Sequence, residues 1–275
     1  MRRYERYVAT ILLAFCVLSS YAQPKIIAHR GFWDKLGSAQ NSLASLENAI
    51  KMGEVYGSEL DVWITKDGKL VLNHDSNFQG VSIEASTYAE LSALRLANGE
   101  PLPTLQQYID MVKKQDKTKL IVEIKGHSTA ANDIRAAAAV AQVINDNGIA
   151  DLVDYISFSQ TVCRELIRLN HAHRVAYLSG DKSPKELKDE GFRGLDYHYG
   201  TLKDAHPEWI KEAKALGLTV NVWTVNDLEL MQYFIMQGVD YITTDNPQLL
   251  KGLLSRPHRP SGAHQKEGNH HHKKQ

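Results

Sequence analysis

Residues 120–147 read LIVEIKGHSTAANDIRAAAAVAQVINDN. The first five residues, Leu120–Ile124, form a short β-rich run that predicts a strand. From Ala130 to Asn147 the apolar residues recur at helical spacing, which predicts an amphipathic helix. A strand followed closely by a helix is the repeating unit of folds that are built on a parallel sheet.

The same strand–helix unit recurs along the rest of the chain. Helical patterns occur, for example, at Ser42–Tyr56 and Pro207–Leu216. With Leu120–Ile124 the parallel-type strands number eight, as a closed barrel requires, so we predict a single (β/α)8 TIM barrel. An open doubly wound sheet is the alternative, but no glycine-rich phosphate loop follows the first strand. The other predicted strands are Lys25–Ala28, Ser58–Ile64, Tyr155–Phe158, Arg174–Leu178, Gly194–Tyr197, Thr219–Trp223 and Tyr241–Thr243.

One strand interrupts this rhythm after the second barrel strand. Leu70–Asn73 follows a tight turn at residues 66–69, and so short a turn predicts an antiparallel hairpin. The connection from Asp75 to Thr104 is longer than usual and includes a short helical pattern at Thr87–Leu96. A turn-rich link at Gly99–Pro103 ends it. We therefore expect a small insertion above the barrel, not a separate domain.

The N-terminus has the pattern of a secretory signal peptide over residues 1–22. Arginines precede the apolar run Val8–Leu18, and small residues flank a cleavage site after Ala22. The apolar run is too short to span a bilayer stably. Lipidation at Cys16 is a weaker interpretation, because bulky Phe15 precedes that cysteine. We expect an exported protein, periplasmic or secreted, with no stable membrane insertion after cleavage.

The remaining chain divides into a barrel at residues 23–255 and a polar tail at residues 256–275, which we expect to be disordered. Cleavage removes three Arg and one Glu from 32 basic and 32 acidic residues, which leaves 29 and 31. This balance gives no reason to expect nucleic acid as a partner. Only Cys163 survives cleavage, so no internal disulfide can form. The sequence does not indicate an oligomeric state.

The active site of a (β/α)8 barrel lies at the carboxyl ends of its strands, so polar residues there are informative. The first strand ends in His29-Arg30-Gly31. Arginine offers a planar fork to phosphate oxygens, and histidine can move a proton near neutral pH. The alternative is a capping histidine beside a surface salt bridge.

Carboxylates lie on the second and third strands. Glu59 and Asp61 are two residues apart, so both side chains point to one face of their strand, and Glu123 ends the next one. Carboxylates that are held this close repel each other unless a cation lies between them. Oxygen ligands favour a hard divalent metal such as Ca2+ or Mg2+. The alternative is a solvated strand face with acidic residues that have no joint role.

Two more residues complete the set. His74 ends the hairpin strand, where it can return to the mouth, and Lys125 adds a positive charge beside Glu123. Lys125 could bind a phosphate or could simply neutralise Glu123. Together the strand ends supply an acid, a base, a metal site and groups that bind anions, which phosphoester cleavage requires.

These segments resemble the glycerophosphodiester phosphodiesterase family from about Lys25 to Leu254. The matching segments are Ala28–Gly31, Glu59–Val62 with Thr65–Gly68, Leu72–Asp75, Pro103–Leu105, Glu123–Lys125, Val222–Asn226 and Gly238–Pro247. The resemblance implies a barrel with a small insertion and metal-dependent hydrolysis of small-molecule phosphodiesters. It implies that the metal is bound by Glu59, Asp61 and Glu123, that His29 and His74 are acid and base, that Arg30 and Lys125 hold the phosphate, and that Trp223 lines the mouth beside the leaving alcohol. A core-packing role is the alternative for Trp223.

The sequence departs from the family pattern at one position. Gln40 stands where the family has a carboxylate. We expect this position to lie outside the metal ligands, so that the substitution alters the charge of the site but does not remove the metal.

Three rival functions fit the same residues. A related barrel phospholipase acting on lysolipid or phosphoinositide head groups is one rival. A glycoside hydrolase using Glu59 and Glu123 is another. The third is a non-catalytic phosphate-ester binding protein.

Overall fold

Eight parallel strands form a closed ring in the computed structural model, which describes residues 22–256. Consecutive strands of the ring pair with each other, and β1 pairs with both β2 and β11, which closes it. The predicted (β/α)8 barrel is therefore confirmed. In chain order its strands are β1 (Lys25–Ala28), β2 (Val55–Ile64), β6 (Lys119–Ile124), β7 (Val153–Ser157), β8 (Val175–Tyr177), β9 (Gly194–His198), β10 (Thr219–Trp223) and β11 (Tyr241–Thr244).

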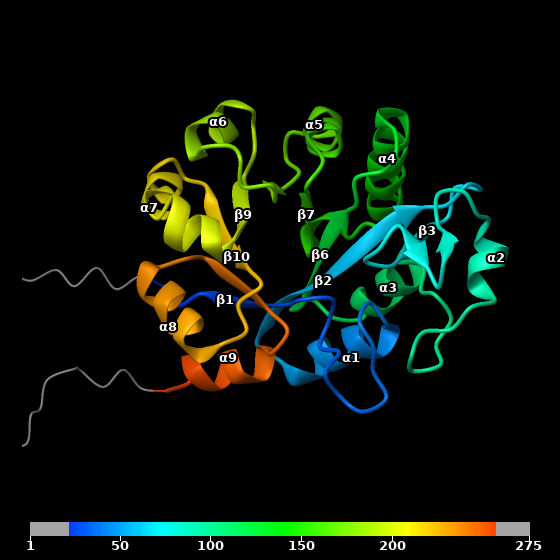
Figure 1. The fold of residues 1–275 in the computed structure, drawn as a ribbon, viewed down its shortest axis with the longest axis horizontal. Helices are drawn as coiled ribbons and strands as arrows, with labels where there is room; N and C mark the ends of the chain where they lie inside the picture. Colours follow the sequence, from blue (N-terminus) through cyan, green and yellow to red (C-terminus); the bar gives the residue numbers. More distant parts are fainter. Residues whose placement is uncertain (1–21, 257–275) are drawn as a thin grey trace, which may run out of the picture.

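A helix follows each barrel strand before the next one begins, and Figure 1 shows these helices arranged around the strands. Most begin with a serine, threonine, aspartate or asparagine whose side chain accepts a hydrogen bond from a backbone N–H of the first turn. The helices are α1 (Leu43–Met52), α3 (Leu105–Val112), α4 (Ala130–Asp146), α5 (Gln160–Leu169), α6 (Pro184–Asp189), α7 (Glu208–Ala215), α8 (Leu228–Gln237) and α9 (Pro247–Leu254).

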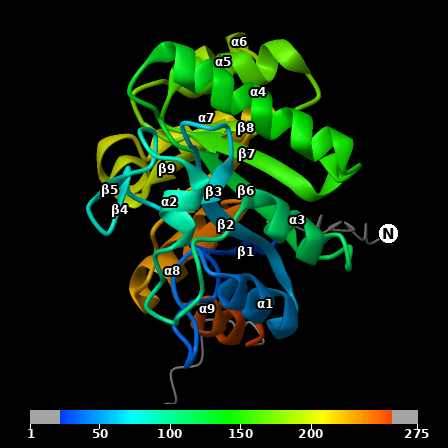
Figure 2. The same ribbon diagram turned by 90° about the vertical axis from the view of Figure 1, so that its right-hand side faces the viewer.

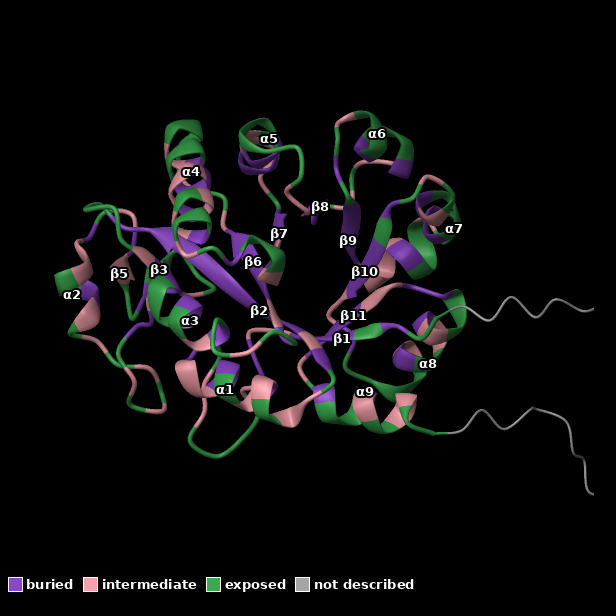
Figure 3. Cartoon of the chain, turned by 180° about the vertical axis from the view of Figure 1, so that it is seen from behind, coloured by how far each residue is buried: buried purple, intermediate pink, exposed green. Residues whose placement is uncertain are grey.

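Apolar side chains pack on both faces of the strands. The larger cluster fills the space between the strands and the helices. A smaller cluster inside the barrel contains Ile27, Ile121, Ile156 and Leu178. Figure 3 shows the strands as buried, whereas the outer faces of the helices are exposed. Because side chains alternate between these two faces, the inward residue nearest each strand's carboxyl end faces the mouth.

The end of the first helix is a correction. We expected a helix over Ser42–Tyr56, but α1 ends at Met52 and β2 already begins at Val55. Gly53 has a φ of 68°, which terminates the helix, and the next residue also has a positive φ. Val55 then pairs with β1, so residues whose spacing predicted a helix belong instead to a barrel strand.

The predicted hairpin and insertion are both present. Strand β3 (Leu70–Leu72) pairs antiparallel with β2. The insertion contains a small hairpin of β4 (Asn77–Phe78) and β5 (Val81–Ser82), and the short helix α2 (Tyr88–Ser92). It has its own buried core, and Figure 2 shows it beside the carboxyl ends of the strands. That core consists of Trp63, Val71, Phe78, Ile83, Leu91 and Leu102.

The predicted signal peptide at residues 1–22 and the predicted tail at residues 256–275 lie outside the described range, apart from one residue each. Within the described range, no helix combines the length and the apolar character that a bilayer crossing requires.

Candidate active site

Glu59, Asp61 and Glu123 meet at the mouth of the barrel. The first two lie on β2, and Asp61 is directly opposite Glu123 of β6 in the parallel register. One carboxylate oxygen from each residue lies within 4.8 Å of those from the other two. All three side chains are buried, with residue exposures of 2%, 1% and 8%. The structure therefore brings together the three carboxylates that the sequence singled out.

The three carboxylates are buried close together, and this raises the pKa values of two of them. Burial, followed by the charges of Asp61 and Glu123, raises the pKa of Glu59 well above its ordinary range. Burial and the charge of Asp61 raise the pKa of Glu123 to about 7. The buried Oε1 atom of Glu59 has no hydrogen-bond partner. A buried oxygen without a partner is costly, and a cation would satisfy it.

Lys125 and Asn41 hold the central carboxylate. The Lys125 ammonium lies 3.2 Å from Asp61 Oδ1 and 2.8 Å from Glu123 Oε1. Asn41 donates from Nδ2 to Asp61 Oδ2 at 2.9 Å, and its own Oδ1 accepts from the Asp61 backbone N–H. Burial would raise the pKa of Asp61, but Lys125 and the Asn41 amide lower it below its ordinary value. Asp61 is thus the carboxylate of the cluster best held as an anion.

His29 is fixed in orientation by Asp245. Its Nδ1 lies 2.7 Å from Asp245 Oδ1, and its Nε2 lies 4.0 Å from Glu59 Oε2. Asp245 also accepts from Trp33 Nε1 at 3.2 Å and from Asn226 Nδ2 at 2.8 Å. Burial opposes ionisation of Asp245, but these hydrogen bonds and the charge of His29 lower its pKa. A carboxylate on Nδ1 holds the proton there and leaves Nε2 facing the carboxylate cluster.

We expect Asp245→Asn to lower kcat roughly 10- to 100-fold, which is the usual loss when a residue that orients an active-site side chain is replaced. The amide cannot hold His29 in one tautomer and orientation as a carboxylate does, so fewer molecules present Nε2 to the carboxylate cluster. Asp245→Glu should partly restore activity. Exposed Asp204→Asn is the matched control. An unchanged kcat in Asp245→Asn would contradict this positioning role.

His74 lies at the rim, less enclosed than His29. It follows β3, and the neighbouring Asn73 N–H donates to the backbone carbonyl of Asp61 at 3.1 Å. Its Nδ1 is 2.7 Å from Asp75 Oδ1, and 44% of its side chain is exposed. Burial, followed by the charge of Lys125, lowers the pKa of His74. Both predicted histidines therefore reach the mouth, each with a carboxylate on Nδ1.

Arg30 sits where the chain turns sharply away from β1. Its φ is 55°, and its backbone N–H donates to Glu59 Oε2 at 2.8 Å. Its Nη1 donates to Gln40 Oε1 at 2.7 Å, whereas its buried Nε has no partner and lies 3.8 Å from Asp61 Oδ2. Gly31 must follow, because a Cβ there would lie 2.3 Å from Ser45 Oγ. The side-chain oxygen of Gln40 is thus directed at the arginine.

Trp223 ends β10 and is half-buried, in contact with the apolar cluster inside the barrel. Its Nε1 donates to the backbone carbonyl of Asp196 at 2.9 Å. His198, at the end of β9, lies beside it with ring centroids 5.1 Å apart. Tyr197, the residue before His198, points outward into the core and donates to the Lys182 carbonyl.

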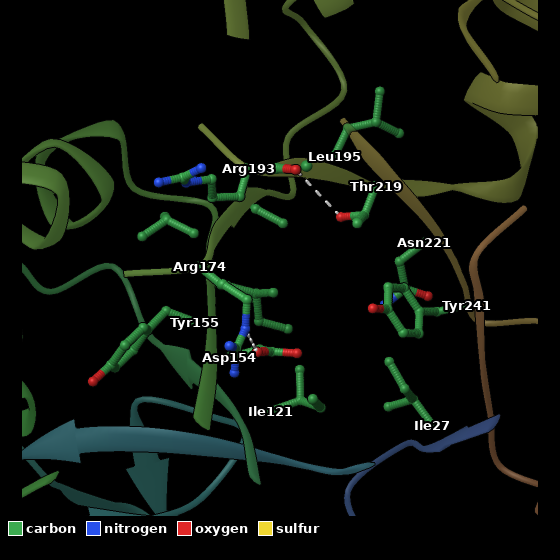
Figure 4. Close-up of a pocket in the computed structure, with 14 residues that line it drawn as sticks. Ile27, Ile121, Asp154, Tyr155, Arg174, Arg193, Leu195, Thr219, Asn221 and Tyr241 are labelled. Carbon is green, nitrogen blue, oxygen red and sulfur yellow. Dashed lines mark hydrogen bonds and ion pairs between the residues drawn. The ribbon is translucent and has the colours of Figure 1, made fainter. Parts of the chain in front are cut away.

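The opposite end of the barrel, where the strands begin, contains a small cavity and an ion pair. A cavity of about 60 Å³ lies there, at the starts of β7 to β11, and Figure 4 shows its lining. An ion pair joins Arg174 to Asp154, and the Tyr56 hydroxyl donates to Asp154 at 2.7 Å. Within residues 22–256 the acidic cluster suited to a metal lies at the mouth and not here. The mouth is therefore the candidate active site.

The carboxylates, histidines and cationic side chains at the mouth of this barrel are the groups that a phosphoric diester hydrolase requires. The model of the glycerophosphoryl diester phosphodiesterase family matches residues 29–249. The chain belongs to this family of enzymes, which hydrolyse glycerophosphodiesters.

Individual relatives agree with this assignment. The chain is 28% identical to a glycerophosphodiester phosphodiesterase of Caldanaerobacter subterraneus subsp. tengcongensis, covering 84% of this chain and 98% of the relative. A crystal structure of a glycerophosphodiester phosphodiesterase from Parabacteroides distasonis is 49% identical, with a TM-score of 0.82 over 84% of this chain and 97% of that one. A phosphodiesterase from Oleispira antarctica, solved with the product sn-glycerol-3-phosphate, shares the fold at 24% identity and a TM-score of 0.74, covering 85% and 98%.

Asp245 and Asn226 are among the site residues that sequence reasoning missed. Both lie in segments that carried the family resemblance, but no role followed from their type or spacing. The available signal was their position, because Asp245 directly follows β11, Asn226 lies three residues after β10, and these strand ends face the mouth.

Proposed function

We propose that this protein hydrolyses glycerophosphodiesters to glycerol phosphate and an alcohol, with a divalent metal and two histidines. The observation that carries the proposal is the buried cluster of Glu59, Asp61 and Glu123 within reach of the His29 imidazole. Such a cluster is unfavourable as a structural element, since burial and mutual repulsion raise two of the three pKa values. It becomes favourable as a site for a cation.

The donor set fits a hard divalent cation such as Ca2+ or Mg2+. Three carboxylates offer oxygen ligands only, and Glu59 Oε1 is buried without a partner. We propose Glu59, Asp61 and Glu123 as the ligands. When bound, the ion supplies Lewis-acid polarisation of the phosphoryl oxygens and offsets charge in the transition state.

The histidines move the protons. One imidazole takes a proton from the attacking oxygen, which belongs to water or to a neighbouring glycerol hydroxyl. The other imidazole gives a proton to the departing alkoxide. In both His29 and His74 a carboxylate occupies Nδ1, so Nε2 is the atom that exchanges the proton.

The cationic side chains bind the phosphate. Arg30 has a buried Nε without a partner and a guanidinium whose far edge is held by Gln40. Lys125 is shared between two carboxylates in the cation-free cluster. A bound divalent cation would take over that neutralising role and free the ammonium for the phosphate. Lys125 would then neutralise the carboxylates in the metal-free protein and bind the phosphate in the metal-bound protein. Trp223 lies beside the leaving alcohol.

Export to the periplasm or beyond is a further part of the proposal, and it rests on the signal-peptide pattern at residues 1–22. N-terminal sequencing of the protein recovered outside the cytoplasm should begin at Gln23. Recovery of intact Met1 in the cytoplasmic fraction would count against export.

A substrate panel tests the activity. We expect release of glycerol phosphate and free alcohol from glycerophosphodiesters that carry choline, ethanolamine, glycerol or inositol. Lysophospholipids, phosphatidylinositol and aryl glycosides should react much more slowly. Tight binding of the glycerophosphodiesters without any released alcohol would instead identify a binding protein. Faster turnover of lysolipid than of its deacylated counterpart would identify a phospholipase.

A further inference from the structure

Three aromatic rings at the mouth have no part in the chemistry described so far. Phe158 directly follows β7, and His198 and Trp223 end β9 and β10. The rings of Phe158 and Trp223 meet edge to face with centroids 5.7 Å apart, and those of His198 and Trp223 meet similarly at 5.1 Å. We call these three residues the aromatic wall.

The aromatic wall faces the inside of the barrel. Two residues before Phe158 lies Ile156, a member of the inner apolar cluster, and Trp223 packs on the same cluster. Along the ring of strands, β9 and β10 lie on the far side from β2, which carries Glu59 and Asp61, whereas β7 is the neighbour of β6, which carries Glu123. A diester whose phosphate lies at the carboxylates can therefore extend one of its two arms toward the wall.

Two polar atoms of the wall's side chains are already engaged. Trp223 Nε1 donates to the Asp196 carbonyl at 2.9 Å, and His198 Nδ1 accepts from the Gly200 N–H at 3.0 Å. In the neutral His198 ring the proton is then on Nε2, which can only donate. The carbonyl of Phe158 accepts from the Ser179 hydroxyl at 3.1 Å. The side chains of the wall thus offer aromatic faces and no free hydrogen-bond acceptor. The Asp196 carboxylate lies on the same face of β9 as His198, but it is buried, with an exposure of 1%.

A primary ammonium group has three N–H donors and binds poorly where no acceptor is available. A quaternary ammonium group has no N–H and is attracted to aromatic faces, most strongly to tryptophan. Phe158 is 44% exposed, so its face is open to a group that enters from the mouth. Given the proposed function, we infer that the aromatic wall is the leaving-group subsite and selects a quaternary ammonium alcohol of the choline type.

The wild-type enzyme tests this with three substrates that share the glycerol phosphate moiety. They are glycerophosphocholine, glycerophosphoethanolamine and the 3,3-dimethylbutyl ester, which has the shape of choline without its charge. We expect kcat/KM for the choline diester to exceed each of the other two by about 10-fold, from cation–π attraction at two rings. Equal kcat/KM for the choline diester and its neutral counterpart would overturn the inference.

The variant Phe158→Leu tests whether the preference for choline arises at the aromatic wall. Phe158→Leu keeps an apolar side chain but removes one aromatic face, so the preference for choline over the neutral counterpart should fall by about 3- to 5-fold. Turnover of the neutral ester by the same variant measures the loss of apolar contact, so the ratio of the two substrates isolates the effect of the charge. Tyr88→Leu, on α2 of the insertion, is the control and should leave the ratio unchanged. An unchanged ratio in Phe158→Leu would exclude the wall as the subsite. Absence of turnover with every diester would instead refute the proposed function itself.

Discussion

Replacing His29 by alanine is expected to lower kcat by about 100-fold or more, the usual contribution of a positioned acid or base. His29 is mostly enclosed, and its Nε2 points toward the carboxylate cluster while Asp245 holds Nδ1. No neighbouring residue can take over proton transfer at that position, because the other imidazole, His74, is held at the rim by Asp75. His74→Ala should cause a loss of similar size.

Steady-state kinetics on a glycerophosphodiester check both variants. If the two histidines act as an acid and a base, the double variant should lose little more than either single variant, because residues that act as a unit are not additive. His171→Ala, at an exposed position between α5 and β8, is the control and should retain wild-type turnover. Near-normal kcat in either His29→Ala or His74→Ala would remove that residue from the mechanism.

The barrel and its carboxylates could be predicted because both depend on local patterns. Strand–helix alternation is visible in any stretch of about thirty residues, and side chains at i and i+2 of a strand share a face wherever the strand lies. Glu59 and Asp61 follow from this rule alone. Glu123 follows once β6 is placed next to β2, which chain order already suggests.

The role of Asp245 depends on long-range contacts and could not be predicted in the same way. Its contact with His29 exists because β11 closes the barrel against β1, which joins residues 216 positions apart. The early end of α1 is similar, since pairing of Val55 with β1 outweighs a helical pattern that continues past Gly53. In the insertion, the two-residue strands β4 and β5 are too short to leave a periodic signal.

Removal of divalent metal is expected to abolish turnover, and addition of Ca2+ or Mg2+ should restore it. The reason lies in the cluster itself, because three buried carboxylates with one ammonium between them lack enough positive charge to bind an anionic diester nearby. Thermal unfolding provides a second measurement that is independent of activity. Metal that binds only the folded protein should raise Tm with increasing concentration. Full activity after exhaustive chelation would rule out the metal.

The pH dependence of the metal-free protein follows from the same cluster. The folded pKa values of Glu59 and Glu123 lie above the ordinary carboxyl value, and that of Glu123 is about 7. Between an unfolded pKa of about 4.5 and pH 7 the folded state therefore holds more protons than the unfolded state, so stability falls as pH rises through this window. Asp61, with its lowered pKa, loses its stabilising effect only at lower pH. With metal bound as the counter-charge, this fall in Tm should disappear.

Glu59→Gln separates this explanation from a general effect of charge. The amide keeps the shape of the side chain but removes one buried anion, so metal-free protein should be more stable than wild type near pH 7.5. The same change removes a proposed ligand, so the metal-dependent rise in Tm and the restored turnover should both be lost. Glu212→Gln, at an exposed position of α7, should change neither property. A Glu59→Gln protein that gains as much stability from Ca2+ or Mg2+ as the wild type does would show that the metal binds without this carboxylate, and the three-carboxylate site would have to be abandoned.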